Sequence, residues 1–121
     1  MYTFQQIYSL LRIPNVPVYV RIQNRKKTMK MINNYGEIYN CINPADKDPW
    51  DIIVPGYKPL KRDTPIMFKK LEGVMLLPNG NHKLIIDVHT TQKRKGVKRD
   101  VERFRKLYEE HTKLTSDVIY F

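Results

Sequence analysis

The hydrophobic period of the chain changes at Val97, and this switch restricts the folds that the sequence can adopt. Beyond it, apolar residues recur at helical spacing and predict one long amphipathic helix: Val101, Phe104, Leu107, Tyr108 and Leu114. Before it, prolines and glycines separate short strand-like runs, at residues 16–23, 27–32, 50–55, 64–78 and 82–89, and a last run follows at 116–121. This pattern predicts the α+β class, as a small OB-like antiparallel β-barrel with a C-terminal covering helix.

Glycines mark the predicted turns and irregularities. Asn79-Gly80 lies between two strand-like runs and predicts a tight hairpin with a primed turn, because such turns need positive φ angles. Gly36 predicts a bend or a close approach of two backbones, and Gly73 predicts a bulge in a curved sheet.

Residues 3–13 combine a capping-box pattern with helical spacing, so a short helix is predicted there.

Length and composition limit the chain to one domain. Its 121 residues, 41% of them hydrophobic, suffice for one small core, so we expect a single domain over residues 1–121. The single cysteine, Cys41, excludes an intramolecular disulfide. The N-terminal residues show neither a secretory pattern nor a membrane-spanning run, so we expect a cytoplasmic protein with no membrane partner.

Positive charge dominates the sequence and is unevenly distributed. Lys and Arg number 22 against 12 Asp and Glu, which gives a formal net charge of +10. Residues 21–30 and 92–99 are rich in Lys and Arg and contain no acid. Such runs attract polyanions, whether phosphorylated metabolites or nucleic acid, although they also serve as solubilising charge on an exposed face.

Against this background, three carboxylates crowd into six residues: Asp46, Asp48 and Asp51. We expect them in a turn before a buried strand, where Pro49 stiffens the backbone and Trp50 packs into the core. Two interpretations are open from the residues alone. The turn is either a solvent-exposed acidic turn or a site for a hard divalent cation such as Mg²⁺, which takes a few carboxylates and completes its shell with water or phosphate.

Three segments in order resemble the soluble, family I inorganic pyrophosphatases. They are NNYG at 33–36, DKDPWDIIVPGYKPL at 46–60, and EGVMLLPNGNHKLIIDV at 72–88. That family carries an N-Y-G segment, a D-G-D-P-x-D-V signature, and a G-V-L strand that leads through a turn to a lysine. The resemblance covers residues 33–88, and the predicted helix and terminal strand also follow in that family.

The resemblance implies specific roles for eight residues. Asp46 and Asp51 resemble ligands of the activating metal ions, Asp48 resembles the general base that takes a proton from the attacking water, and Asn81 replaces a further ligand. The remaining residues resemble groups that bind substrate phosphate: Tyr35, Lys83, Tyr108 and, in place of a family arginine, Arg25. Metal ions and cations together would neutralise the phosphates and activate water.

The chain also departs from the family pattern. Lys47 stands where the signature has glycine, and Asn81 stands where the family has an acidic ligand. Met31 replaces a tyrosine, and Glu109 replaces a lysine that follows the helical tyrosine. The aspartate signature is therefore kept, while several outer residues of the family site are not.

Two functions from different classes follow. The resemblance implies an enzyme of phosphate metabolism, an inorganic diphosphatase that uses Mg²⁺, or Mn²⁺, and that forms a homo-oligomer as the family commonly does. The alternative is a protein of the same fold with weakened catalysis, which binds nucleic acid or another polyanion through its basic surface.

Overall fold

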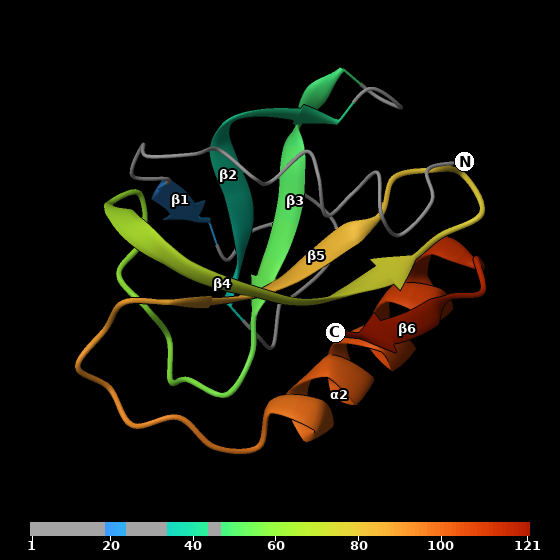
Figure 1. The fold of residues 1–121 in the computed structure, drawn as a ribbon. Coiled ribbons are helices and arrows are strands. Elements are labelled where there is room, and N and C mark those ends of the chain that lie inside the picture. Colours follow the sequence, from blue (N-terminus) through green and yellow to red (C-terminus); the bar gives the residue numbers. More distant parts are fainter. Residues whose placement is uncertain (1–18, 24–33, 44–46) are drawn as a thin grey trace.

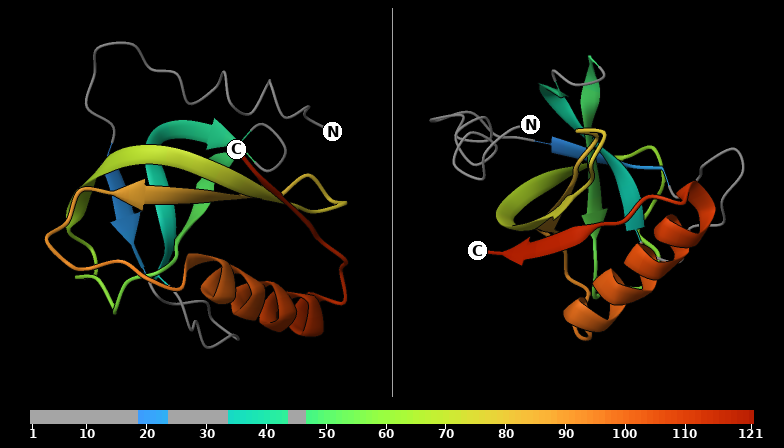
Figure 2. Two further views of the ribbon diagram at one scale, coloured as in Figure 1. Left: turned by 60° about the horizontal axis from the view of Figure 1, so that its bottom comes forward. Right: turned by 90° about the vertical axis from the view of Figure 1, so that its right-hand side faces the viewer.

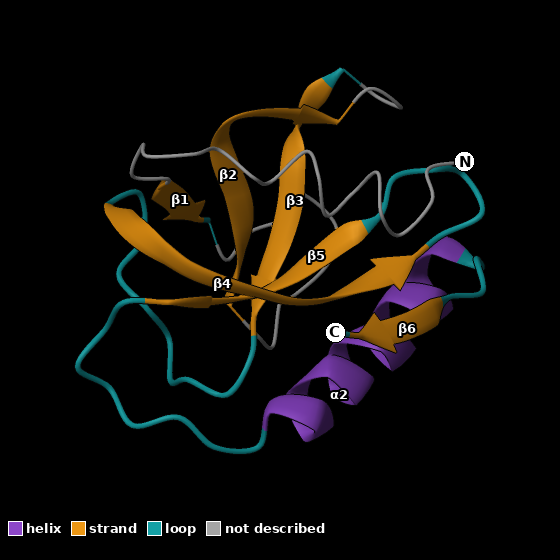
Figure 3. Cartoon of the chain, in the orientation of Figure 1, coloured by secondary structure: helices purple, strands orange, loops and turns teal. Residues whose placement is uncertain are grey.

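The structure is a computed structural model, and it describes residues 19–23, 34–43 and 47–121 of the chain. One helix and six strands are present in this part (Figures 1 and 3). The strands are β1 (Tyr19–Ile22), β2 (Asn34–Asn43), β3 (Asp48–Val54), β4 (Pro65–Leu76), β5 (Lys83–Val88) and β6 (Asp117–Tyr120), and the helix is α2 (Val97–Thr112).

Five of the strands close into a barrel. They hydrogen-bond in the order β1-β2-β3-β5-β4, and β1 pairs a second time with β4, which closes the ring. β4 is the longest strand and curves around the barrel, while β6 adds to its other end outside the ring (Figure 1). The predicted small OB-like barrel with a covering helix is confirmed. The sheet is mostly antiparallel, and β3 and β5 form its one parallel pair among the described strands.

Strand alternation divides the buried side chains into two layers. The inner layer fills the barrel and consists of Val20, Ile22, Ile38, Trp50, Ile52, Val54, Leu60, Leu71, Val74, Leu84, Ile86 and Val88. The outer layer lies between the barrel wall and α2 and consists of Tyr35, Ile53, Met75, Leu77, Ile85, Val101, Phe104 and Tyr108. Figure 2 shows α2 against the outside of the barrel. Trp50 is 0% exposed, as predicted from its place in the signature.

The long helix predicted from the change of hydrophobic period is present, and α2 begins at Val97. Gly96 precedes it with φ 74°, and Lys113 ends it with φ 60° and donates its backbone N–H to the Glu109 carbonyl oxygen. Val101, Phe104 and Tyr108 form the buried stripe of α2. Leu114 lies beyond the last helical residue, so this end of the predicted apolar face is wrong.

The hairpin between β4 and β5 is present, but its turn differs from the prediction. Only Gly80 has a positive φ, 81°, and its N–H donates to the Leu77 carbonyl oxygen over 3.1 Å. The Asn79 side-chain oxygen accepts the N–H of Asn81 instead. Two-residue hairpin loops need primed turns because the turn must match the twist of the two strands. The connection here has six residues, 77–82, so its turn is not bound by that requirement.

Other expectations fall outside the described residues. These are the helix at 3–13 and the strand at 27–32. Within the described residues, no helix is both long enough and apolar enough to cross a membrane.

Gly36 marks a close approach of two backbones and Gly73 lies at an irregularity of β4, as predicted, and Gly73 also marks a close approach. A Cβ added at Gly36 would lie 1.8 Å from the Arg21 carbonyl oxygen of β1. A Cβ at Gly73, where the register of β4 shifts, would lie 2.5 Å from the Ile119 carbonyl oxygen of β6. Both positions therefore require glycine, because the nearest atoms belong to a neighbouring strand and cannot rotate away.

We predict that Gly36→Ala destabilises the protein by about 3 kcal/mol, because the added methyl group must separate β1 from β2 or distort both. Denaturant unfolding measures the change. Lys70→Ala, at an exposed position of β4, is the control and should change the free energy of unfolding by less than about 0.5 kcal/mol. A Gly36→Ala protein as stable as the control would contradict the close approach of these strands.

Candidate functional site

A buried ion pair joins β3 to β5. The parallel register pairs Asp51 directly with Lys83, and Lys83 Nζ donates to Asp51 Oδ2 over 2.5 Å. The Lys83 side chain is 0% exposed, whereas that of Asp51 is 24% exposed. An ammonium group removed from water needs an opposite charge close by, so the Asp51 carboxylate is what permits a lysine at this position.

Two tyrosines border the ammonium group. Lys83 Nζ lies 5.3 Å from the ring centroid of Tyr108 and 6.0 Å from that of Tyr35. Phe104 stands between the two tyrosine rings, with centroid distances of 5.7 Å to Tyr35 and 5.9 Å to Tyr108. The quadrupoles of the tyrosine rings add to the attraction of Asp51 for the cation. Thus β2, β3, β5 and α2 each contribute one residue to this cluster: Tyr35, Asp51, Lys83 and Tyr108.

The electrostatics of this Asp51–Lys83–tyrosine cluster keep Tyr108 protonated. Burial raises the pKa of Tyr108 above its usual value, and the nearby negative charge of Asp51 raises it further. A phenol with a raised pKa keeps its proton and is able to donate a hydrogen bond to an anion.

Besides Asp51, the structure describes one more aspartate of the signature, Asp48. Asp48 is exposed and is the first residue of β3. The expected turn is wrong for Asp48 and Asp51, because the pairing of β3 with β2 extends through the signature and sets Asn43 opposite Asp48 and Glu37 opposite Asp51. Asp46 lies outside the described residues.

Lys47 adopts the backbone conformation that its glycine counterpart in the family would favour. Its φ is 62°, in the left-handed region, and its N–H donates to the Asn43 carbonyl oxygen over 2.8 Å. A lysine in this conformation costs about 1 kcal/mol relative to glycine. The hydrogen bond from Lys47 to Asn43 therefore joins the residue before β3 to the end of β2.

Asn81 lies in the connection between β4 and β5, two residues before Lys83, and is partly exposed. Arg25 lies outside the described residues. Of the eight residues that the resemblance singles out, the structure brings four into one cluster: Tyr35, Asp51, Lys83 and Tyr108. The grouping was implied by the resemblance and not by spacing along the chain, since the four residues lie on separate elements.

The described donors suit a hard cation in type. Asp48 and Asp51 offer carboxylate oxygens and Asn81 offers an amide oxygen, which are the ligands that Mg²⁺ prefers. Within the described residues, no three His, Cys, Asp or Glu side chains form one group able to hold a metal ion. Mg²⁺ is usually held by one or two carboxylates together with water and substrate phosphate, so these donors match such a site in chemical type.

A second network was not predicted. Arg94 donates from Nη1 and Nη2 to the two oxygens of Glu72, over 2.9 and 2.5 Å, and Nη1 lies 3.4 Å from Asp87 Oδ2. The Tyr57 hydroxyl donates to Asp87 Oδ1 over 2.6 Å, and burial followed by this bond raises the pKa of Tyr57 to about 12. No local pattern links these four residues, because they come from β4, β5, the segment after β3 and the segment before α2.

No model of a known protein family matches this chain, and no curated protein matches its sequence.

We predict that Asp51→Asn lowers the free energy of unfolding by about 3 kcal/mol, because the buried ammonium group of Lys83 loses its carboxylate. Lys83→Met should cost less, since Asp51 retains contact with water. The double variant should be less destabilised than the sum of the single variants by at least about 1 kcal/mol. Additive single effects in denaturant unfolding would contradict a direct ion pair.

Proposed function

We propose that the protein hydrolyses inorganic pyrophosphate to two phosphate ions with Mg²⁺, or Mn²⁺, as cofactor. The observation that carries the proposal is the meeting of Tyr35, Asp51, Lys83 and Tyr108 beside the C-terminal half of α2. These residues are the ones to which the resemblance to family I pyrophosphatases gives metal-binding and phosphate-binding roles.

The cluster has the donors that a pyrophosphate ion needs. Lys83 offers an ammonium group, and Tyr108 offers a hydroxyl donor, whose pKa is raised by burial and by Asp51. On substrate binding, a phosphate oxygen would replace Asp51 Oδ2 as the acceptor of the Lys83 hydrogen bond. One anionic partner of the ammonium group would then be exchanged for another. The buried ammonium group then stays neutralised throughout substrate binding, which avoids the cost of an unpaired charge.

The carboxylates supply the rest of the chemistry. Asp51, with Asp46 and Asn81, would hold the cofactor, which supplies Lewis-acid chemistry by neutralising phosphate charge and lowering the pKa of water. Asp48 is exposed at the start of β3 and would act as the general base that accepts a proton from the attacking water. The net charge of +10 favours the approach of the anionic substrate.

The decisive test is phosphate release from pyrophosphate by the full chain with Mg²⁺. Asp48→Asn should lower the rate by at least about hundredfold, because it removes the general base while leaving the fold intact. Lys83→Met should raise the KM and lower the rate. Asp117→Asn, an exposed carboxylate on β6, is the control and should leave the rate within about twofold.

Two results would oppose the proposal. The first is a parent protein that releases no phosphate above a blank at any Mg²⁺ or Mn²⁺ concentration. The second is activity that survives Asp48→Asn unchanged, since hydrolysis would then depend on a different site.

Lys47 provides a second, independent test. Lys47→Gly removes a positive charge next to Asp48, so we expect a lower Mg²⁺ concentration for half-maximal rate. It also relieves the left-handed backbone strain at residue 47, so the free energy of unfolding should rise by up to about 1 kcal/mol. Lys113→Gly is the matched control, because Lys113 has φ 60° and carries the same charge at the end of α2. It should gain stability and leave the Mg²⁺ concentration for half-maximal rate unchanged. An identical Mg²⁺ response in both variants would contradict a cation site at Asp48.

A further inference from the structure

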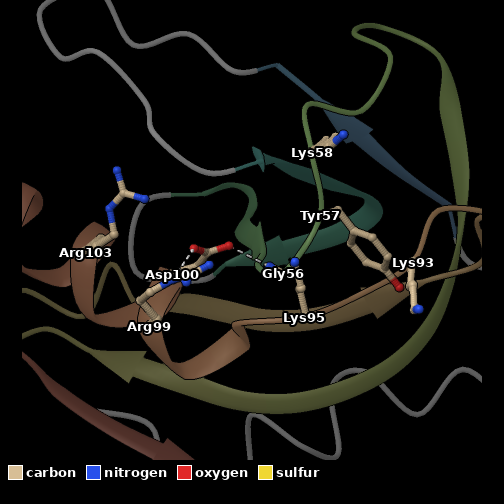
Figure 4. A pocket seen from close by; sticks show the side chains of 8 residues that line it. All are labelled: Gly56, Tyr57, Lys58, Lys93, Lys95, Arg99, Asp100 and Arg103. Carbon is tan, nitrogen blue, oxygen red and sulfur yellow. Dashed lines mark hydrogen bonds and ion pairs between the residues drawn. The ribbon is translucent and has the colours of Figure 1, made fainter.

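A hollow with a volume of about 260 Å³ lies at the N-terminal end of α2, and we call it the basic hollow. Its cationic lining residues come from three segments: Lys58 after β3, Lys93 and Lys95 before α2, and Arg99 and Arg103 on α2. Asp100 is the one acidic residue among those described that line it. Figure 4 shows these side chains around Gly56 and Tyr57 at the centre of the view.

Most of this positive charge is not neutralised by the protein. Lys58, Lys93, Lys95 and Arg103 form no ion pair with any carboxylate in the described part of the chain. The Asp100 carboxylate is already engaged, because Oδ2 accepts the N–H of Gly56 over 2.9 Å and Oδ1 lies 3.9 Å from Arg99 Nε. Several cations of one sign around a concave surface raise the local potential and concentrate anions there.

The walls of the basic hollow are held in place. Arg94 donates from Nε to the Pro55 carbonyl oxygen over 3.0 Å, while its guanidinium nitrogens bind Glu72. The Lys95 N–H donates to the Gly56 carbonyl oxygen over 3.0 Å, which ties the segment before α2 to the segment after β3. These bonds hold together the two backbone segments that carry Lys58, Lys93 and Lys95. A site that is ordered before binding loses less entropy when it binds.

Gly56 shows how closely the two segments meet. It has φ 89°, and an added Cβ would lie 2.8 Å from Arg94 Cγ. Glycine is therefore required for both the backbone conformation and the contact. The position of the α2 N-terminus adds a partial positive charge on the same side as the cations.

We propose that the basic hollow binds a compact polyphosphate anion, with two or more phosphoryl groups in a row. The cations line one hollow of limited volume and come from three segments, which suits a short, highly charged ligand. The basic hollow adjoins the first turns of α2, whereas Tyr108 of the proposed catalytic cluster lies in the last turns. The proposal is therefore independent of pyrophosphate hydrolysis.

The test measures binding of inorganic tripolyphosphate to the full chain by calorimetry, with a chelator present so that no divalent cation contributes. The parent should bind, and Lys95→Gln combined with Arg103→Gln should raise the Kd by at least about tenfold, because two charge-assisted contacts are lost. Lys61→Gln combined with Lys70→Gln is the control. It removes the same charge from exposed positions outside the lining, and its Kd should stay within about threefold of the parent value.

Three results would overturn the proposal. No binding by the parent at low salt would show that the basic hollow does not recognise phosphate. An equal loss of affinity in the control would assign the binding to overall charge. Displacement of tripolyphosphate by a single-stranded oligothymidylate at a much lower concentration, lost in the Lys95 and Arg103 variant, would make the site one for a nucleic-acid backbone.

Discussion

The parallel pairing of β3 with β5 is the constraint on which the rest of the structure depends. β4 lies between these strands in the sequence, and it runs antiparallel to β5 before the chain enters β5. β4 must therefore pass around the barrel, which lets its first residues pair with β1 and its last residues pair with β6. The same register sets Asp51 beside Lys83, so the closure of the barrel and the position of the ion pair have one origin.

The Asp51–Lys83 ion pair has a high desolvation cost for a position that only needs to be packed. A buried lysine loses hydration, and the attraction of one carboxylate often only balances that loss, so an apolar residue would serve the outer layer at least as well. Ile53 and Ile85, the next outward-facing residues on the same two strands, show the apolar alternative under the same helix. A charged pair in this place, partly open to solvent on the Asp51 side, is more readily explained by binding than by stability.

Periodicity predicted the elements far better than their pairing. The period change at Val97 predicted α2, and the strand-like runs bounded by turn residues predicted β4, β5 and β6. Parallel pairing of β3 with β5 was not predictable from local pattern, since it depends on how β4 wraps. The Arg94 network was missed for the same reason. The Asp51–Lys83 meeting was implied by the family resemblance, whereas the turn expected at Asp48 failed because β2 pairs with β3 through the signature.

The two ends of α2 present opposite electrostatic situations. Beside Tyr108, in the C-terminal half of the helix, the cation of Lys83 is buried, neutralised by Asp51 and bordered by two aromatic rings. Beside its first turns, the cations of the basic hollow stand at the positive end of the dipole with little compensation. Stability alone would oppose the second arrangement, because like charges repel one another and the dipole adds to the repulsion. The Arg94 network nevertheless ties the segments that carry these charges to the barrel, so the fold keeps several cations close together at this end of the helix.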